Sequence, residues 1–170
     1  MRVLTLTDAL GLTEIPANGI AWHDAVINEG LPYRSAKALS KELGLKESEL
    51  LAFLGLNAEL AKQRKTLGFL GSGESDVAYR LARVLVRAIN LKGSKAEGVE
   101  WLKAENDKLR DRRPLDLCRS TIGHEYVNAL LDRIAPLPAE EAVHPEAPDY
   151  VEELAQEPVD VMQAAEELPD

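Results

Sequence analysis

The chain has 170 residues, of which 45% are hydrophobic and 29% charged, an ordinary composition for a globular protein with one or two small cores. Its one cysteine, Cys118, excludes a disulfide within these residues and favours a reducing compartment. We see no signal peptide and no apolar run long enough to span a membrane. We therefore expect a cytoplasmic protein with no membrane partner.

Charge is distributed unevenly along the chain. The net charge is −9, but no Lys or Arg follows Arg133, and residues 134–170 hold eleven of the 29 acidic residues. Residues 1–133 therefore carry 20 basic and 18 acidic side chains, a net charge of +2. An acidic average does not exclude a nucleic-acid partner for this part of the chain. Residues 136–170 are acidic and Pro-rich, which predicts a tail that is disordered without a partner.

The first half predicts short helices separated by glycines. Residues 1–18 lack a sustained period and indicate a poorly packed N-terminal arm, with a helical turn at 7–12. Leu-Gly-Leu occurs at 43–45 and 54–56, and each is predicted to be a turn whose leucines dock the flanking helices. Together these features predict a helix-turn-helix domain at 19–73. Its helices are expected at residues 19–30, 33–43, 47–54 and 58–67.

The second half predicts longer helices and no strands, so the expected fold class is all-α. The clearest helix is 74–90, where apolar residues repeat at three and four while Arg80, Arg83 and Arg87 line another face. Ser94 is expected to cap a helix that runs to Lys103. A short helix should start at Pro114, and Thr121 should cap a last helix, within a domain at 74–135. The side chains expected to face inward on that last helix are Ile122, Tyr126, Ala129, Leu130 and Ile134.

Catalytic patterns are not found in the sequence. His23, His124 and His144 have no second ligand at metal-binding spacing. Cys118 is expected to be half-buried and inert. The segment Gly71-Ser72-Gly73 is too short to hold a phosphate and is predicted to be a loop before a helix. We therefore expect no catalytic residue, no metal, no cofactor and no enzymatic activity.

The helix expected at 58–67 is the candidate for DNA recognition. Its polar side chains are types that contact phosphates and base edges. The alternative is an exposed helix end whose cations are favoured by the helix dipole, and the residue pattern leaves both open. The candidate DNA-binding residues are Asn57, Lys62, Gln63, Arg64 and Lys65.

Several motifs occur in an informative order. In the first part the chain reads Gly30-Leu31-Pro32, Leu43-Gly44-Leu45, Leu54-Gly55-Leu56 and Arg80-Leu81-Ala82-Arg83. In the second part it reads Trp101-Leu102, Asn106, Pro114-Leu115-Asp116-Leu117, Gly123 and Arg133-Ile134. Over residues 20–134 this order resembles antitoxins of the Xre/MbcA/ParS type, from bacterial toxin–antitoxin pairs.

The resemblance implies an Xre-like helix-turn-helix domain followed by a small helical toxin-binding domain. It implies a cognate toxin, most often a RES-domain enzyme that degrades NAD, whose active site the antitoxin blocks. It also implies a homodimer and autorepression through operator DNA. The alternative is a stand-alone helix-turn-helix transcription regulator.

Within the toxin-binding domain, the resemblance and side-chain chemistry together define a candidate contact set. Trp101, Leu115 and Leu117 are expected to pack inside and hold polar contacts in place. The candidate toxin-binding residues are Trp101, Asn106, Asp111, Arg112, Arg113, Pro114, Leu115, Gly123 and Arg133.

The acidic tail at 136–170 has two open interpretations, as a solubilising segment or as an anionic strand over the toxin's substrate cleft.

Overall fold

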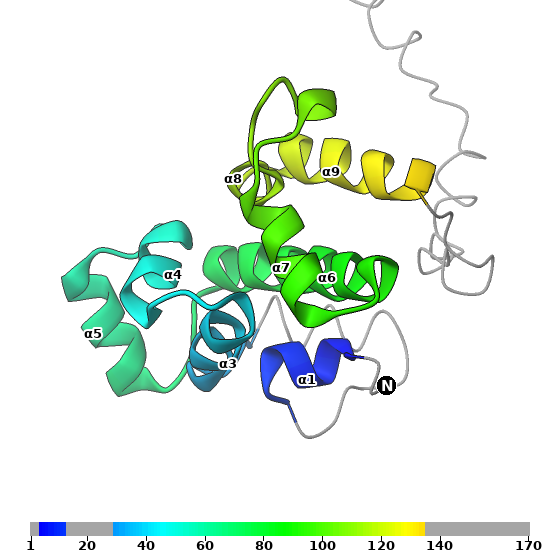
Figure 1. Cartoon of the computed structure of the whole chain (residues 1–170). Coiled ribbons are helices and arrows are strands. Elements are labelled where there is room, and N and C mark those ends of the chain that lie inside the picture. Colours follow the sequence, from blue (N-terminus) through cyan, green and yellow to red (C-terminus); the bar gives the residue numbers. More distant parts are fainter. Residues whose placement is uncertain (1–3, 13–28, 135–170) are drawn as a thin grey trace, which may run out of the picture. The chain divides into compact units, whose positions relative to one another are not determined.

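The computed structural model describes residues 4–12 and 29–134, which lie in one compact unit spanning residues 1–137. These described residues form α-helices, a 3-10 turn and two isolated β-bridges, which confirms the all-α prediction (Figure 1). The helix predicted at 19–30 lies outside the described residues except for Glu29 and Gly30, which are not helical, and the acidic tail lies outside them as well. None of the described helices has the length and apolarity needed to cross a membrane.

The first helix, α1 (Leu6–Leu10), overlaps the helical turn predicted at 7–12, but its burial corrects the prediction of a poorly packed arm at residues 4–12. Thr5 and Asp8 cap it reciprocally, and Ala9 and Leu10 are completely buried. The helix packs on α3 and α6. Gly11 permits this close approach, because a Cβ built there would lie only 2.8 Å from Ala38 Cβ. Five residues are too few to show in the sequence which side of the helix is buried.

Three short helices follow as expected: α3 (Arg34–Leu43), α4 (Glu47–Phe53) and α5 (Ala58–Leu67). Gly44 and Gly55 both have positive φ, and leucines on both sides of each turn are buried or half-buried. The two Leu-Gly-Leu turns therefore dock their flanking helices, as predicted.

The longest helix, α6 (Ser72–Lys92), contacts α1, α3, α7 and α9, so the fold is organised around it. It begins two residues before the predicted start, so Ser72 and Gly73 are helical rather than a loop. The Glu74 carboxylate accepts the Gly71 N–H and thereby satisfies a backbone donor at the helix start. The predicted apolar stripe is confirmed by the buried residues Leu81, Val84, Leu85 and Ala88.

The last part comprises α7 (Lys95–Lys103), the 3-10 turn η2 (Asp107–Leu109), α8 (Pro114–Leu117) and α9 (Thr121–Ile134). Ser94 caps α7 by accepting the Glu97 N–H at 3.2 Å, and Pro114 occupies the first turn of α8, both as predicted. Ser120, rather than Thr121, caps α9, since its Oγ accepts the Gly123 N–H at 3.0 Å.

The predicted inward face of α9 is wrong. Ile122 is 68% exposed, Tyr126 is 65% exposed and Ile134 is 49% exposed, while Leu130 is only partly buried. The helix is rotated so that smaller and more polar residues face the core. The buried residues of α9 are Gly123, His124, Val127 and Leu131.

Contacts also join the two halves of the described chain. Lys95 pairs with Glu42 at 2.9 Å, and Lys103 Nζ donates to the Gly44 carbonyl at 3.2 Å. α7 therefore closes against the end of α3. The predicted domain boundaries remain predictions.

Candidate functional site

The first candidate surface is α5, whose ten residues include none that is buried. The Asn57 side chain accepts the Leu60 N–H at 2.9 Å and so fixes the start of the helix. Lys62, Gln63 and Lys65 are exposed and make no hydrogen bond or ion pair through their side chains with any residue in the described part of the chain. These three side chains are available to an anionic partner such as phosphate.

Arg64 differs from the other candidate DNA-binding residues. Its Nε and Nη2 donate to the Glu74 carboxylate at 3.1 Å, in a partly buried ion pair. The pair joins the end of α5 to the start of α6 beside Gly71, where a Cβ would approach both partners. Arg64 therefore supports the position of α5 in the free chain.

The second candidate surface includes the turn at residues 106–113. The Asn106 side chain accepts the Lys108 N–H at 3.0 Å, and its backbone pairs with Arg112. Arg110 and Asp111 both have φ of 57°, an uncommon left-handed conformation for residues other than glycine. The tight turn presents Asp111 and Arg112 to solvent.

The candidate residues that follow this turn already make contacts within the chain. Arg113 pairs with Asp116 at 2.7 Å, and the hydrogen bond from that pair raises the pKa of Arg113. Pro114 and Leu115 are buried, so they hold α8 in place rather than present side chains to solvent. Of the predicted contact set, Asp111, Arg112 and Arg113 lie together on the surface.

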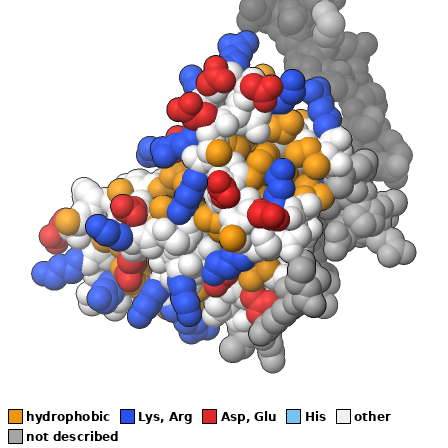
Figure 2. Space-filling view, in the orientation of Figure 1, with side chains coloured by type: hydrophobic (Ala, Val, Ile, Leu, Met, Phe, Trp, Pro, Cys, Tyr) orange, Lys and Arg blue, Asp and Glu red, His pale blue; other side chains and the backbone are white. Residues whose placement is uncertain are grey.

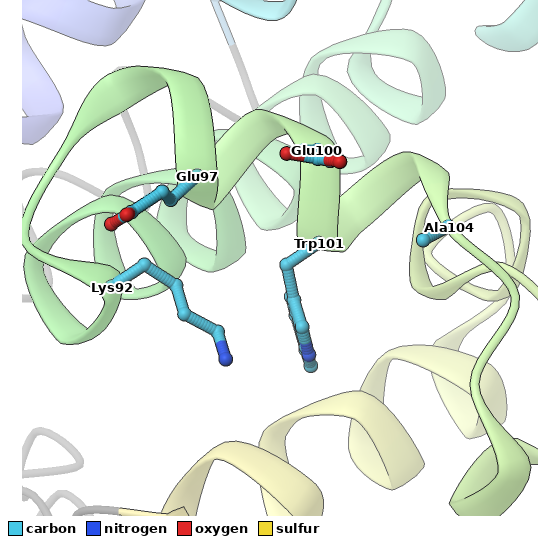
Figure 3. A pocket seen from close by; sticks show the side chains of 5 residues that line it. All are labelled: Lys92, Glu97, Glu100, Trp101 and Ala104. Carbon is cyan, nitrogen blue, oxygen red and sulfur yellow. The ribbon is translucent and has the colours of Figure 1, made fainter.

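Trp101 is half-buried and lines an open pocket of about 430 Å³. The Lys92 Nζ lies 5.9 Å from the centre of the Trp101 ring, a cation–π contact between the ends of α6 and α7. Figure 3 shows both side chains extending in the same direction, with Glu97 and Glu100 on the same helix as Trp101. Trp101 therefore combines the predicted packing role with an accessible edge.

Arginines of α6 bind one edge of α9, and the sequence pattern did not predict these contacts. Arg80 donates to Thr121 Oγ1 at 3.3 Å. Arg87 donates to Asn128 Oδ1 at 3.0 Å and pairs with Asp132 at 2.6 Å. Because charge-assisted hydrogen bonds are directional, these contacts hold one edge of α9 against α6. Polar residues at 128 and 132, four apart on one helix, were the available sequence signal.

His124 continues this network into the interior. The Asn128 amide nitrogen lies 3.0 Å from His124 Nε2 and within donating distance. Burial, with a smaller contribution from the nearby positive charges of Arg80 and Arg83, lowers the pKa of His124 to about 4. The imidazole is thus neutral at physiological pH and acts in packing.

Cys118 is completely buried, more than the predicted half-burial. Desolvation raises the pKa of its thiol to about 12, which agrees with the expected inert residue. Within residues 4–12 and 29–134, no group of three His, Cys, Asp or Glu residues is placed so that it could hold a metal ion.

The outward side of α9 carries the exposed apolar side chains Ile122 and Tyr126, and Arg133 is exposed near its end. Gly123, from the predicted set, is buried where the helix meets α8, and a Cβ there would lie 2.2 Å from the Leu117 carbonyl oxygen. Figure 2 shows hydrophobic side chains gathering over the region where Figure 1 draws α9 and the helices beside it.

Comparison with protein families matches residues 86–135 to the antitoxin Xre/MbcA/ParS C-terminal toxin-binding domain. The matched region runs from the second half of α6 to the end of α9. It contains the turn at 106–113, Trp101 and the outward side of α9. Comparison with curated proteins found no match.

Proposed function

We propose, from the premise that residues 86–135 form a toxin-binding domain of the Xre/MbcA/ParS antitoxin family, that this chain is an antitoxin that neutralises a RES-type, NAD-degrading toxin. The antitoxin blocks the active site of the toxin by binding, with no catalysis and no cofactor of its own. It acts in the cytoplasm as a homodimer.

The observation that carries this proposal is the family match. The structure adds support, because the matched region forms a connected set of helices with an exposed polar turn and an exposed apolar helix face. Exposed apolar groups next to charged groups are typical of surfaces that bind proteins.

Coexpression with the toxin encoded by the neighbouring gene tests the proposal. The toxin alone should stop growth and deplete cellular NAD, and this chain should restore both and copurify with the toxin. An unrelated helix-turn-helix protein expressed at the same level is the control. Absence of both rescue and copurification would refute the antitoxin function.

A second candidate function is DNA binding by α5. The observation that favours it is the exposed set Lys62, Gln63 and Lys65 on a helix that follows a tight turn at Gly55. This arrangement is similar to the recognition helix of a helix-turn-helix unit. In this proposal the chain represses its own operon, alone or together with the toxin.

A binding titration against promoter DNA at two salt concentrations tests this second function. Lys62→Ala and Lys65→Ala should each weaken binding, and the loss of one phosphate contact should reduce the salt slope by about 1. Lys108→Ala, on exposed η2, is the matched control. Arg64→Ala is less informative because Arg64 pairs with Glu74. No binding by either the free chain or the toxin complex would exclude this function.

The acidic tail is tested separately. Deleting residues 136–170 and measuring toxin inhibition distinguishes the two interpretations. A substantial loss of inhibition supports a strand over the substrate cleft, whereas unchanged inhibition with lower solubility supports a solubilising tail.

A further inference from the structure

We infer that the toxin docks on the outer face of α9, defined here as Ile122, Tyr126, Ala129 and Arg133. This inference rests on the proposed antitoxin function and names the surface that would carry it. Ile122, Tyr126 and Ala129 were expected from the sequence to face the core, whereas Arg133 belongs to the predicted toxin-binding set.

The outer face is a continuous stripe. Its residues are spaced by four, three and four positions, so they lie on one side of the helix. The buried residues of α9 occupy the opposite side. Ile122 and Tyr126 are 68% and 65% exposed, so most of their apolar surface contacts water in the free chain. Burying that apolar surface against a partner is favourable in free energy, so this face is suited to binding.

The structure holds this face in one orientation. Arg87 pairs with Asp132, and Arg80 donates to Thr121, along the edge of α9 that meets α6. Gly123 allows close contact with the Leu117 carbonyl. Because the helix cannot rotate without breaking these contacts, little ordering is needed when a partner binds.

The position of this face within the matched domain favours the toxin as its occupant. In the described part of residues 86–135, the large hydrophobic side chains classed as exposed are Ile122, Tyr126 and Ile134, and all three belong to α9. The other exposed large hydrophobics of the described chain, Leu60, Leu67 and Phe69, lie on or next to α5, outside the match. A tyrosine at the centre of such a face is a residue type that dominates binding energy at protein interfaces.

The charges beside the face indicate the chemistry of the partner. Glu125 and Arg133 are exposed, and neither makes an ion pair with any residue in the described ranges. η2 packs against α9, so the turn that exposes Asp111 and Arg112 lies next to this helix. The complementary toxin surface is an apolar patch with an acidic group opposite Arg133 and a basic group opposite Glu125.

Binding of the full chain to the purified, catalytically inactivated toxin tests the inference. Tyr126→Glu and Ile122→Glu should each raise the Kd by at least about tenfold, since they place a charge in an apolar contact. Tyr126→Phe, which keeps the ring, should stay within about threefold of the original Kd. Leu67→Glu, an exposed leucine of α5, is the matched control and should leave the Kd unchanged. Thermal unfolding of each variant verifies that the fold is retained.

The outcomes separate this inference from the antitoxin function. If the unsubstituted chain binds the toxin and both α9 variants bind within about twofold, the docking surface lies elsewhere while the function stands. If the unsubstituted chain does not bind, both proposals fail. If Tyr126→Glu instead converts a dimer into a monomer in sedimentation without changing toxin affinity, a second copy occupies the face and the inference is overturned.

Discussion

Helices α5 and α9 both present large apolar side chains to solvent, yet the fold supports them differently. α5 has no buried residue and is held by its Asn57 cap and by the Arg64–Glu74 ion pair at its far end. α9 buries four residues, and arginines of α6 bind its edge. α5 therefore lies at the periphery of the core, whereas α9 is part of it.

This difference shows that exposure alone does not define the role of a helix. The exposed side of α9 lies opposite the side that packs in the core, so its position is fixed, which suits a specific protein contact. The exposed side of α5 is polar and basic on a helix with few core contacts, which suits contacts to a phosphate backbone.

Leu131→Ala should lower the free energy of unfolding by about 2–5 kcal/mol, because it leaves a cavity at a completely buried position of α9. Leu67→Ala on α5, where the side chain is 58% exposed, should change it by less than about 0.5 kcal/mol. Urea denaturation of both variants measures the difference. Similar losses in the two variants would show that α5 is as much a part of the core as α9.

Gly123→Ala should destabilise the fold by about 1–3 kcal/mol, since the added Cβ would overlap the Leu117 carbonyl. Gly73→Ala is the matched control, because it lies in the first turn of α6 with no atom within 4 Å of the Cβ position. That change should be neutral or stabilise by about 0.4–1 kcal/mol. Thermal melts of the pair test whether the close approach of α9 to α8 is needed.

His124 should make stability depend on pH. Above pH 6.5 the imidazole is neutral in both the folded and the unfolded chain. Below that value the unfolded chain binds a proton, while the folded chain resists until about pH 4. The free energy of unfolding should therefore fall by about 1–2 kcal/mol between pH 7 and pH 5.

His124→Gln should remove most of this dependence and is compared with the unsubstituted chain over the same range. Because carboxylates titrate mainly below pH 5, the window from pH 7 to pH 5 isolates the histidine. An equal slope in both proteins would contradict the assignment.

Arg64→Ala should cost about 1 kcal/mol, since it removes the ion pair that holds the end of α5 to α6. Lys65→Ala, the exposed neighbour, should cost less than about 0.5 kcal/mol. A double-mutant cycle with Glu74→Ala measures the coupling directly. Zero coupling would mean that α5 is held in place by other contacts.

Much of the fold could be predicted from local patterns. The cap residues Asn57 and Ser94, the glycines of the two Leu-Gly-Leu turns and Pro114 mark helix boundaries through backbone chemistry that needs no distant partner. The core stripe of α6 followed from its repeat of apolar residues. The resemblance to Xre/MbcA/ParS antitoxins followed from the order of motifs that includes Trp101-Leu102 and Gly123, and the match of residues 86–135 to the C-terminal domain of that family confirms it.

The candidate site was less predictable because exposure depends on rotation about a helix axis. On α9 the larger apolar residues gave an inward stripe, but that pattern ignores Arg87, which binds Asn128 and Asp132 from another helix. Similarly, the side-chain types of residues 57–65 predict a DNA contact at Arg64. The packing of α5 beside α6 instead places Arg64 next to Glu74, with which it forms an ion pair.

Caps and turn glycines act through neighbours along the chain, so the sequence alone predicts where helices start and end. The order of motifs likewise predicts the family model that residues 86–135 match. Which side of α9 faces water depends instead on tertiary contacts. The observed rotation of α9 buries Val127 and Leu131 and forms the arginine contacts, and these gains offset the exposure of Ile122 and Tyr126. The arginine contacts join side chains more than 40 residues apart in sequence, so the local pattern does not show them.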